Sequence, residues 1–292
     1  MKLYKTTITP VSNFATKLKG DTLFGQTCWA IRFKFGQDRL KELLDKYDKS
    51  PFLVVSDPFA KGYLPKPVMP SFYLGEDSLK KKENRKKIWL TPEQLRQGDF
   101  ANAKRSEYIK SKDYEKVVMR NSINYISFTT EEDAFAPYGD KESKMSPKDI
   151  YFLLGEDFAL DELVKALEFV AKVGYGKDAT IGKGRFEFTN LVEQDISFDS
   201  KTYMALGPFV PNDTPCVELF YEPFTRFGKL GASRANTNPF KKPIIFADTG
   251  AVICFEKRQS LQFVGKAIKN ISSYEDVVHQ GYAIVFPIKD FS

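Results

Sequence analysis

Histidine and cysteine are scarce in this chain of 292 residues, which has one histidine and three cysteines. Cys28, Cys216 and Cys254 are odd in number and far apart, so their spacing fits neither a disulfide framework nor a zinc site built on a C-x-x-C pair. We therefore expect reduced, buried thiols and no bound metal or other cofactor. With His279 as the single histidine, catalysis by a pair of histidines, one as general acid and one as general base, is excluded.

Long apolar runs are absent too. No stretch approaches the roughly 18 residues that a membrane-spanning helix needs, and the first ten residues, MKLYKTTITP, lack the apolar region of a signal peptide. We expect a cytoplasmic protein with no membrane partner. Hydrophobic residues make up 42% of the chain, which is enough to bury one large core or two medium ones.

Charge is unevenly distributed, although the net charge is only +6. Residues 76–120 carry 13 Lys and Arg against 8 Asp and Glu, residues 172–185 carry 4 against 1, and residues 226–242 carry 5 against 0. These stretches sum to +13, which leaves −7 for the rest. Positive charge concentrated on a mildly acidic body is typical of contact with a polyanion. For residues 80–87 alone, a solvated lysine-rich loop is the alternative.

The most distinctive stretch is residues 173–188, VGYGKDATIGKGRFEF. Glycine permits positive φ and close approach of the backbone to a ligand, and loops of this kind present N–H groups that bind anions. The preceding residues, 160–171, have helical periodicity, and residues 185–188 alternate like a strand. The loop lacks the G-K-S/T ending of a P-loop, and it follows a helix instead of a strand, which disfavours a mononucleotide or dinucleotide site. The alternative is a glycine-rich turn whose basic residues only face water.

Hydrophobic periodicity predicts the other elements. A strand at 3–9 precedes a helix that Asp21 would cap and Gly36 would end. A short helix and a buried strand follow, and a polar stretch later in the chain suits a domain boundary. Residues 76–150 are polar, basic and weakly periodic, so we expect an insertion, with a mobile loop as the alternative. The expected ranges are 38–47 for the short helix, 52–56 for the buried strand, 88–90, 116–119 and 123–129 for strands of the insertion, and 190–200 for the boundary.

Four motifs in order resemble one protein family. Residues 174–186 have the spacing G-x-G, five residues, G-x-G-R-F, which resembles the glycine-rich signature of the RAMP proteins of CRISPR systems. LKGDTLFGQTCWA at 18–30 resembles the first-helix motif of one branch, the subunit of type III-A (Csm) effector complexes that binds the 5′ tag of the guide RNA. RNSIN at 120–124 and GYAIVFPI at 281–288 resemble two further motifs of that subunit.

This resemblance implies an α+β fold with two ferredoxin-like (RRM-like) domains in tandem, each an antiparallel sheet with helices on one face. The first would span residues 1–192, with a thumb-like insertion at about 76–150 and the glycine-rich loop, and the second residues 193–292. The implied function is non-catalytic binding of the 5′ tag, the repeat-derived handle of the guide RNA (crRNA). The implied partners are that RNA, target RNA near the tag end, the large polymerase-like signalling subunit and the backbone RAMP subunit, between which the chain would form a bridge.

The candidate RNA-binding residues lie in the four motifs and in the basic stretch 226–242. There, arginine could bind phosphate bidentately and Phe227 could stack an unpaired base, although a buried Phe227 is the interpretation that we favour for that residue alone. No residue is expected to be catalytic. The full set is Lys19, Gly20, Asp21, Thr22, Arg120, Ser122, Gly174, Gly176, Lys177, Thr180, Gly182, Lys183, Gly184, Arg185, Arg226, Phe227, Lys229 and Arg234.

Two alternatives remain open. A guide-RNA-processing endonuclease of the same superfamily would need an acid and a base, and His279 could fill only one role; we expect it to support the last strand instead.

The acidic run Glu131, Glu132 and Asp133 could bind a metal, but adjacent carboxylates on one loop are usually solvated. A general RNA-binding module would explain the charge, but the chain lacks the K/R-G-F/Y-G/A-F signature of an RNA-recognition motif.

Overall fold

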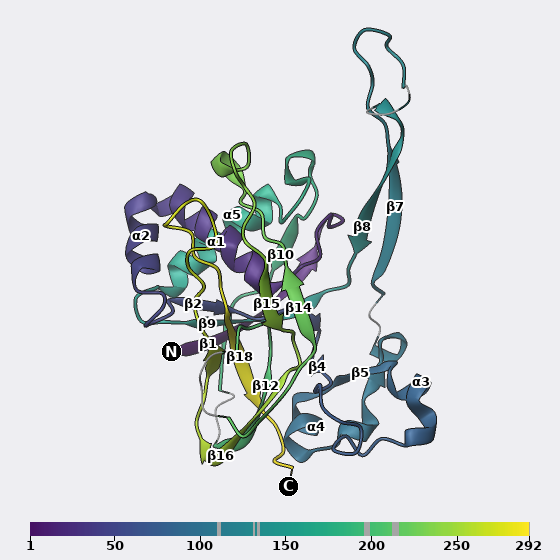
Figure 1. Ribbon diagram of the computed structural model, residues 1–292, viewed down its shortest axis with the longest axis vertical. Helices are drawn as coiled ribbons and strands as arrows, with labels where there is room; N and C mark the ends of the chain where they lie inside the picture. The colour runs from purple at the N-terminus through teal and green to yellow at the C-terminus, as the bar shows by residue number, and fades with distance from the viewer. Residues whose placement is uncertain (110–111, 131, 133–134, 196–198, 212–215, 292) are drawn as a thin grey trace.

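The computed structural model describes residues 1–109, 112–130, 132, 135–195, 199–211 and 216–291. The fold is α+β, with mostly antiparallel sheets and few helices, as predicted (Figure 1). No helix in the described ranges combines the length and the apolar character needed to cross a membrane.

The first sheet contains the N-terminal strand at its centre. Its strand order is β10-β1-β9-β2, with β11 also paired to β1 and β3 to β9, and every pairing is antiparallel. Along the chain these elements run β1, α1, β2, β9, α5, β10, the βαββαβ order of a ferredoxin-like unit. The bounds are β1 Lys2–Pro10, α1 Gly20–Phe35, α2 Gln37–Asp45, β2 Leu53–Val55, β3 Phe59–Ala60, β9 Lys148–Leu154, α5 Leu160–Val173, β10 Phe186–Phe188 and β11 Val192–Gln194.

Between β3 and β9 the chain builds two separate features. One is a small three-stranded sheet with short helices, and the other is a long hairpin, β7–β8, that projects from the body (Figure 1). The strands predicted at 88–90 and 116–119 are confirmed, but the one at 123–129 is wrong, because those residues form turns at the hairpin end. The bounds are β4 Leu64–Pro65, α3 Lys81–Asn84, β5 Lys87–Leu90, α4 Pro92–Gln97, β6 Lys104–Arg105, β7 Tyr114–Arg120 and β8 Tyr138–Lys144, with 3-10 turns at Ser78–Lys80, Phe100–Asn102 and Ser106–Ile109.

The second sheet has the strand order β13-β16-β12-β18-β17. Without β17 and in the direction β18-β12-β16-β13, these strands have the same order as β10-β1-β9-β2 of the first sheet. In each set of four, the last strand along the chain lies beside the first, the first beside the third, and the third beside the second. In the described part of this half there is no α-helix, so the expectation of helices on this second sheet is wrong. Prolines at 208, 211 and 215 in the first connection disfavour a helix there. The bounds are β12 Ser200–Ala205, β13 Glu218–Phe220, β14 Pro223–Arg226, β15 Ile244–Ala247, β16 Val252–Gln259, β17 Phe263–Gly265 and β18 Tyr282–Pro287, where β14 and β15 form a separate pair.

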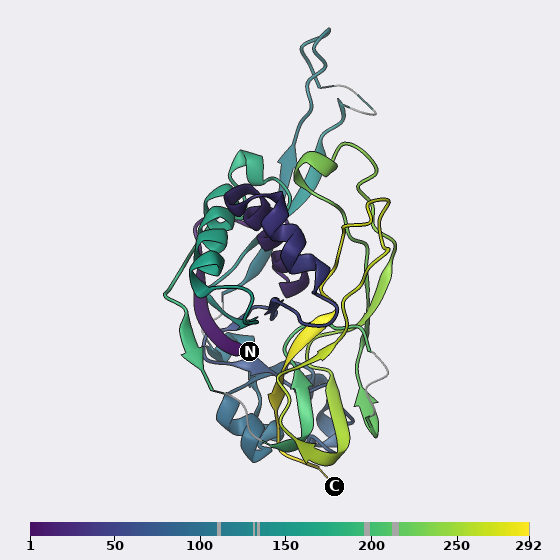
Figure 2. The same cartoon turned by 90° about the vertical axis from the view of Figure 1, so that its left-hand side faces the viewer.

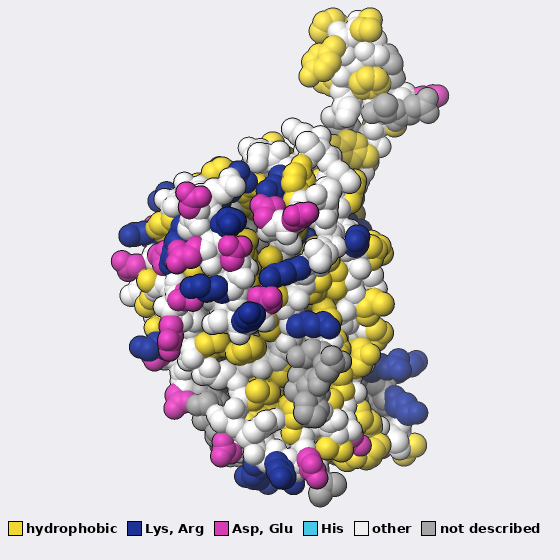
Figure 3. All heavy atoms as spheres, turned by 60° about the vertical axis from the view of Figure 1, so that its left-hand side comes forward, with side chains coloured by type: hydrophobic (Ala, Val, Ile, Leu, Met, Phe, Trp, Pro, Cys, Tyr) yellow, Lys and Arg dark blue, Asp and Glu magenta, His cyan; other side chains and the backbone are white. Residues whose placement is uncertain are grey.

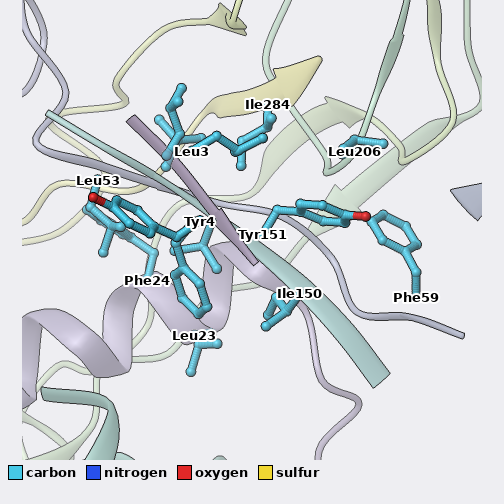
Figure 4. Close-up of a cluster of buried hydrophobic side chains, with 14 of the residues drawn as sticks. Leu3, Tyr4, Leu23, Phe24, Leu53, Phe59, Ile150, Tyr151, Leu206 and Ile284 are labelled. Atoms are coloured by element: carbon cyan, nitrogen blue, oxygen red, sulfur yellow. The ribbon is translucent and has the colours of Figure 1, made fainter. Parts of the chain in front are cut away.

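One hydrophobic core joins the two sheets. Strand β1 contributes Leu3, α1 contributes Phe24, and the second half contributes Leu206 and Ile284, all of them at most 5% exposed (Figure 4). Burying these side chains on both sides of one interface stabilises the two halves together. A buried amide adds a polar link, because the Gln280 side chain accepts from the Val55 N–H at 2.9 Å and donates to the Val55 carbonyl at 2.8 Å.

Replacing Gln280 with leucine is expected to lower the free energy of unfolding by about 3 kcal/mol, because both backbone groups of Val55 would stay buried without a partner. Urea unfolding of Gln280→Leu measures the change. Gln97→Leu, an exposed glutamine on α4, is the matched control and should change stability by less than about 0.5 kcal/mol. Equal effects of the two substitutions would contradict the structural role of Gln280.

Candidate nucleic-acid interface

The glycines of the loop between α5 and β10 have different roles. Gly174 and Gly184 have φ of 109° and 70°, and a Cβ atom on either would lie 2.3 Å or less from a backbone oxygen of the loop itself. At Gly176 a Cβ would meet the Thr16 side chain at 2.6 Å. Gly182 has φ of 86°, but a Cβ there would meet no atom within 4 Å. Internal packing therefore requires Gly174 and Gly184, while Gly182 faces open space.

Most N–H groups of the loop already have acceptors within the protein. Those of Tyr175, Lys177, Gly182, Lys183, Gly184 and Arg185 donate to backbone or hydroxyl oxygens at 2.9–3.1 Å. Within the described part of the chain, no acceptor is found for the N–H groups of Gly176, Asp178, Ala179 and Thr180. The loop N–H groups that could donate to an outside partner without losing an internal hydrogen bond therefore lie in its first half.

Two lysines of the loop form ion pairs with hairpin strand β8. Lys177 Nζ lies 2.7 Å from Asp140 Oδ1, and Lys183 Nζ lies 2.6 Å from Glu142 Oε1. The Glu142 side chain is 1% exposed, and hydrogen bonds from Lys183 and Asn13 hold the pKa of its carboxyl below the usual range. Glu142 is therefore an ionised carboxylate at the base of the hairpin.

Arg120, at the end of β7, completes this group. Its guanidinium Nη2 lies 2.9 Å from Asp178 of the loop and 3.4 Å from Glu142, and its Nε lies 3.3 Å from Asp140. We call the six residues Arg120, Asp140, Glu142, Lys177, Asp178 and Lys183 the ion-pair cluster. It contains three of the cations predicted to bind phosphate, and each of them is paired with a carboxylate, so the cluster fastens the hairpin to the loop.

The start of α1 holds a second set of paired charges. Lys19 Nζ lies 2.7 Å from Asp57 and 2.8 Å from Asp248. Burial works against the charge of Lys19, but the two carboxylates outweigh it and raise the pKa of the ammonium group. Gly20 packs here because a Cβ would lie 2.4 Å from the Ser56 carbonyl oxygen. Lys19 thus links the two halves of the chain through Asp248, whereas the contacts of Gly20 stay within the first half.

Asp21 was expected to cap α1, and this expectation is wrong. The helix starts at Gly20, Lys19 occupies the N-cap without a side-chain bond, and Asp21 is buried. Its carboxylate accepts two hydrogen bonds of 2.7 Å from Arg226 and lies 3.2 Å from His279 Nε2. Burial alone would raise the pKa of Asp21, but the hydrogen bond from His279 and the bonds and charge of Arg226 prevail and hold it well below its usual range.

His279 is buried and contacts a cation on its other side, because its Nδ1 lies 3.3 Å from Lys241 Nζ. Burial, helped by the nearby positive charges, lowers the pKa of the imidazole despite the hydrogen bond to Asp21. A neutral ring that donates from Nε2 to Asp21 and accepts at Nδ1 from Lys241 satisfies every partner. Both ring nitrogens are therefore engaged, and the ring supports the chain before β18, as predicted.

Tyr175 connects the glycine loop to the start of α1. Its hydroxyl donates to the Lys17 carbonyl oxygen at 3.1 Å and accepts from the Lys19 N–H at 3.1 Å. The side chain is fully buried, and burial raises the pKa of the phenol, so it stays protonated. Hydrogen bonds therefore connect the loop to the start of α1, and ion pairs connect it to the hairpin.

The remaining predicted residues lie further apart. Thr22 is half-buried beside Asp21, and Ser122 is half-buried beyond β7, while Thr180 and Arg185 are exposed on the loop. Phe227 is 75% exposed, so the interpretation that it is buried is wrong. Exposed Lys229 lies 5.7 Å from the Phe240 ring. Arg234, at the end of a 3-10 turn at Ala232–Arg234, is paired with Asp276 at 2.7 Å. Figure 3 shows acidic and basic side chains interspersed over the face in view.

The cysteines and the acidic run give no sign of a metal site. No group of three metal-ligating side chains occurs among the described residues, and Glu131 and Asp133 lie outside them. Cys216 is exposed, against the expectation of buried thiols, whereas burial raises the pKa of the Cys28 thiol to about 12.

Comparison with known proteins identifies solved structures that have a similar fold. No family model matches the sequence, and no curated protein matches it. The structure is similar to a chain of a Csm1-Csm4 cassette in complex with AMPPNP, with 19% identity, 98% of both chains covered and a TM-score of 0.60. It is similar to a chain of a Csm3-Csm4 subcomplex of the type III-A CRISPR-Cas interference complex, with 15% identity, 98% of this chain and 100% of that chain covered, and a TM-score of 0.63.

A chain of a type III-B Cmr-beta complex bound to cognate target RNA and AMPPnP is also similar, with 11% identity, 86% of both chains covered and a TM-score of 0.50. Csm4 is the subunit named in both of the first two structures, and the similarity to their chains shows a common fold. The resemblance inferred from the four motifs is therefore confirmed at the level of the fold.

Alanine at Gly184 is expected to destabilise the protein far more than alanine at Gly182. Both residues have positive φ, which costs roughly 1–2 kcal/mol for a residue with a Cβ. Only at Gly184 would the Cβ also meet backbone, 2.1 Å from the Tyr175 oxygen. Thermal unfolding of the two variants measures the difference, and equal losses would contradict the packing role of Gly184.

The stability of the protein is expected to depend on pH through His279. Its pKa is lowered in the folded state, so below about pH 6.5 the unfolded chain takes up a proton that the folded chain refuses, and stability falls as the pH falls. Between pH 7.5 and 5.5, wild type should lose about 1 kcal/mol more unfolding free energy than His279→Gln. Urea unfolding at both pH values tests this, and parallel losses in the two proteins would refute it.

Proposed function

We propose that this protein is a non-catalytic, RNA-binding subunit of a type III-A CRISPR effector complex and that it holds the 5′ tag of the guide RNA. The observation that carries the proposal is the fold, which matches chains of Csm1-Csm4 and Csm3-Csm4 structures over 98% of this chain. The four motifs support it, because contacts join their elements. Tyr175 of the loop bonds to the start of α1, and Arg120 at the end of β7 bonds to Asp178 of the loop. His279, two residues before the motif that contains β18, bonds to Asp21 of α1.

We also propose two ferredoxin-like units, residues 1–192 and 193–292, with the thumb-like insertion at about 76–150. The common strand order of the two sheets supports this division. The large polymerase-like subunit would lie on one side and the backbone subunit on the other, with target RNA near the tag end and the whole complex in the cytoplasm. The similar chains come from structures that pair Csm4 with Csm1 and with Csm3, which favours this arrangement.

The open part of the glycine loop supplies the chemistry for binding phosphate. The N–H groups at residues 176 and 178–180 have no acceptor in the described part of the protein, and Gly182 leaves room for close approach. Arg185 is exposed and forms no ion pair with any described residue. Lys177 is 55% exposed, and a surface ion pair of this kind contributes little stability, so Lys177 can exchange Asp140 for a phosphate.

A non-catalytic role agrees with the surroundings of His279. Its ring is 6% exposed, and both nitrogens contact other side chains, so it cannot reach a 2′-hydroxyl without disrupting the Asp21 site. A processing endonuclease is therefore disfavoured. The alternative of a general RNA-binding module is separated from the proposed function by the identity of the RNA that is bound to the protein.

Sequencing of RNA that copurifies with the complex assembled around the tagged chain tests the proposed function. We expect repeat-derived tags at the 5′ ends of the bound RNA, and this RNA should stay uncut during incubation with the purified protein. A mixture of cellular RNA would support the general module, and specific cleavage lost in His279→Ala would support the endonuclease.

Asparagine at Gly182 is expected to weaken tag binding at least tenfold while the fold is kept. Asparagine tolerates the left-handed backbone better than most residues, so the main effect is a side chain in the space open to RNA. Gly62→Asn is the matched control, because Gly62 has φ of 79° and also meets nothing within 4 Å. Affinity is measured by fluorescence anisotropy with labelled tag RNA at several salt concentrations. Equal affinity of both variants and wild type would show that the loop is only a turn.

A further inference from the structure

The outward face of α1 carries a glycine that the protein's own packing does not explain. Gly25 lies inside the helix, where glycine is less favourable than alanine by about 1 kcal/mol. Its φ is not positive, and a Cβ there would meet no atom within 4 Å, so neither backbone conformation nor internal packing requires glycine. A glycine of this kind suits the close approach of a molecule from outside the chain.

An aromatic ladder continues the same face of α1. Trp29 and Phe33 follow Gly25 at spacings of four residues, so they lie on one stripe of the helix. Their rings are stacked, with centroids 6.0 Å apart, and the Phe33 ring lies 5.6 Å from that of Phe169 on α5. Phe33 is 59% exposed, although burial of such a ring is favourable. Figure 2 shows α1 (purple) with α5 (teal) beside it.

Two cations cover faces of this ladder. The Arg32 guanidinium lies 5.2 Å from the Trp29 ring, and Lys34 Nζ lies 5.5 Å from the Phe169 ring. Toward the helix start the stripe reaches Thr22, which lies beside Asp21 and Tyr175 at the glycine loop. From Thr22 to Phe33 the helix rises about 16 Å.

We propose that this stripe, Thr22, Gly25, Trp29 and Phe33 with Phe169, is a base-stacking track for single-stranded RNA that leaves the glycine loop. The proposal rests on the proposed function and extends it to a second set of contacts. Phe33 is exposed, while Trp29 and Phe169 are half-buried. Aromatic rings that reach the surface next to cations are the combination by which proteins bind single strands, with stacked bases and neutralised phosphates. RNA fits better than a protein partner, because Arg32 and Lys34 match a polyanion and the stripe is continuous with the phosphate-binding loop.

Tryptophan fluorescence can observe this track directly, since Trp29 and Trp89 are the two tryptophans of the chain. Trp89 lies in β5, in the insertion, where its indole N–H donates to Ser106. In the full-length Trp89→Phe protein, an eight-nucleotide oligouridylate should quench Trp29 emission. An abasic oligonucleotide of the same length should not quench it, although anisotropy should show that it binds. Quenching that is equal with both ligands, or absent with both, would overturn the track.

Two substitutions separate the track from a structural role. Phe33→Ala should weaken oligouridylate binding about five- to hundredfold, the range expected for one lost base stack, while Phe72→Ala, a 70% exposed control in the segment after β4, should not. Gly25→Ala should raise the thermal midpoint, because alanine favours the helix, and yet weaken RNA binding at least fivefold. A purely structural glycine would not produce these opposite signs.

The outcomes also separate this proposal from the proposed function. If Phe33→Ala and Gly25→Ala bind RNA like wild type while Gly182→Asn does not, the track is refuted and tag binding stands. If no variant matters and no tag RNA copurifies, both proposals fail. If Phe33→Ala keeps its RNA affinity but the assembled complex loses a protein subunit, the stripe is a protein interface and the RNA assignment is wrong.

Discussion

The buried carboxylate of Asp21 is the contact on which the arrangement of the two halves depends. It joins α1 of the first half to Arg226 of β14 and to His279, which lies three residues before the first residue of β18. A carboxylate without such partners would cost several kcal/mol to remove from water, so the pairing with Arg226 and His279 must form whenever the halves dock. The hydrophobic core makes this docking favourable, and Asp21 makes it specific in position.

Charged residues are also paired with opposite charges at the glycine loop. Three of the cations at the loop are not free to bind an anion, because within the ion-pair cluster the carboxylates of β8 and of the loop itself neutralise them. A phosphate that enters must therefore exchange with a carboxylate, contact the exposed Arg185 or use the N–H groups that have no acceptor in the described part of the chain. Binding of this kind depends less on total charge than on which pairs are exposed enough to open, and Lys177 is more accessible than Lys183.

The sequence predicted the elements that have strong periodicity and the family of the fold, but it predicted the environment of charged residues poorly. The helix after Lys19 follows from local periodicity, and the α+β fold with antiparallel sheets agrees with the resemblance carried by four motifs. That Asp21 is buried could not be seen, because its partner Arg226 lies 205 residues away and an aspartate before a helix usually caps it. The carboxylates of β8 were missed for the same reason: their alternation along a hairpin strand carries no sign of the loop that they face.

Hairpin β7–β8 ends in exposed apolar residues, among them Tyr125 and Ile126 at 88% and 90% exposure. The contact with the glycine loop lies near the point where the paired strands stop, because Arg120 is the last residue of β7 and Asp140 is the third residue of β8. Mechanically the hairpin is a cantilever: the ion-pair cluster holds its two strands, and residues 121–130 beyond them extend away from the body of the protein (Figure 1). The apolar side chains at this end are therefore open to contact with a surface outside the chain.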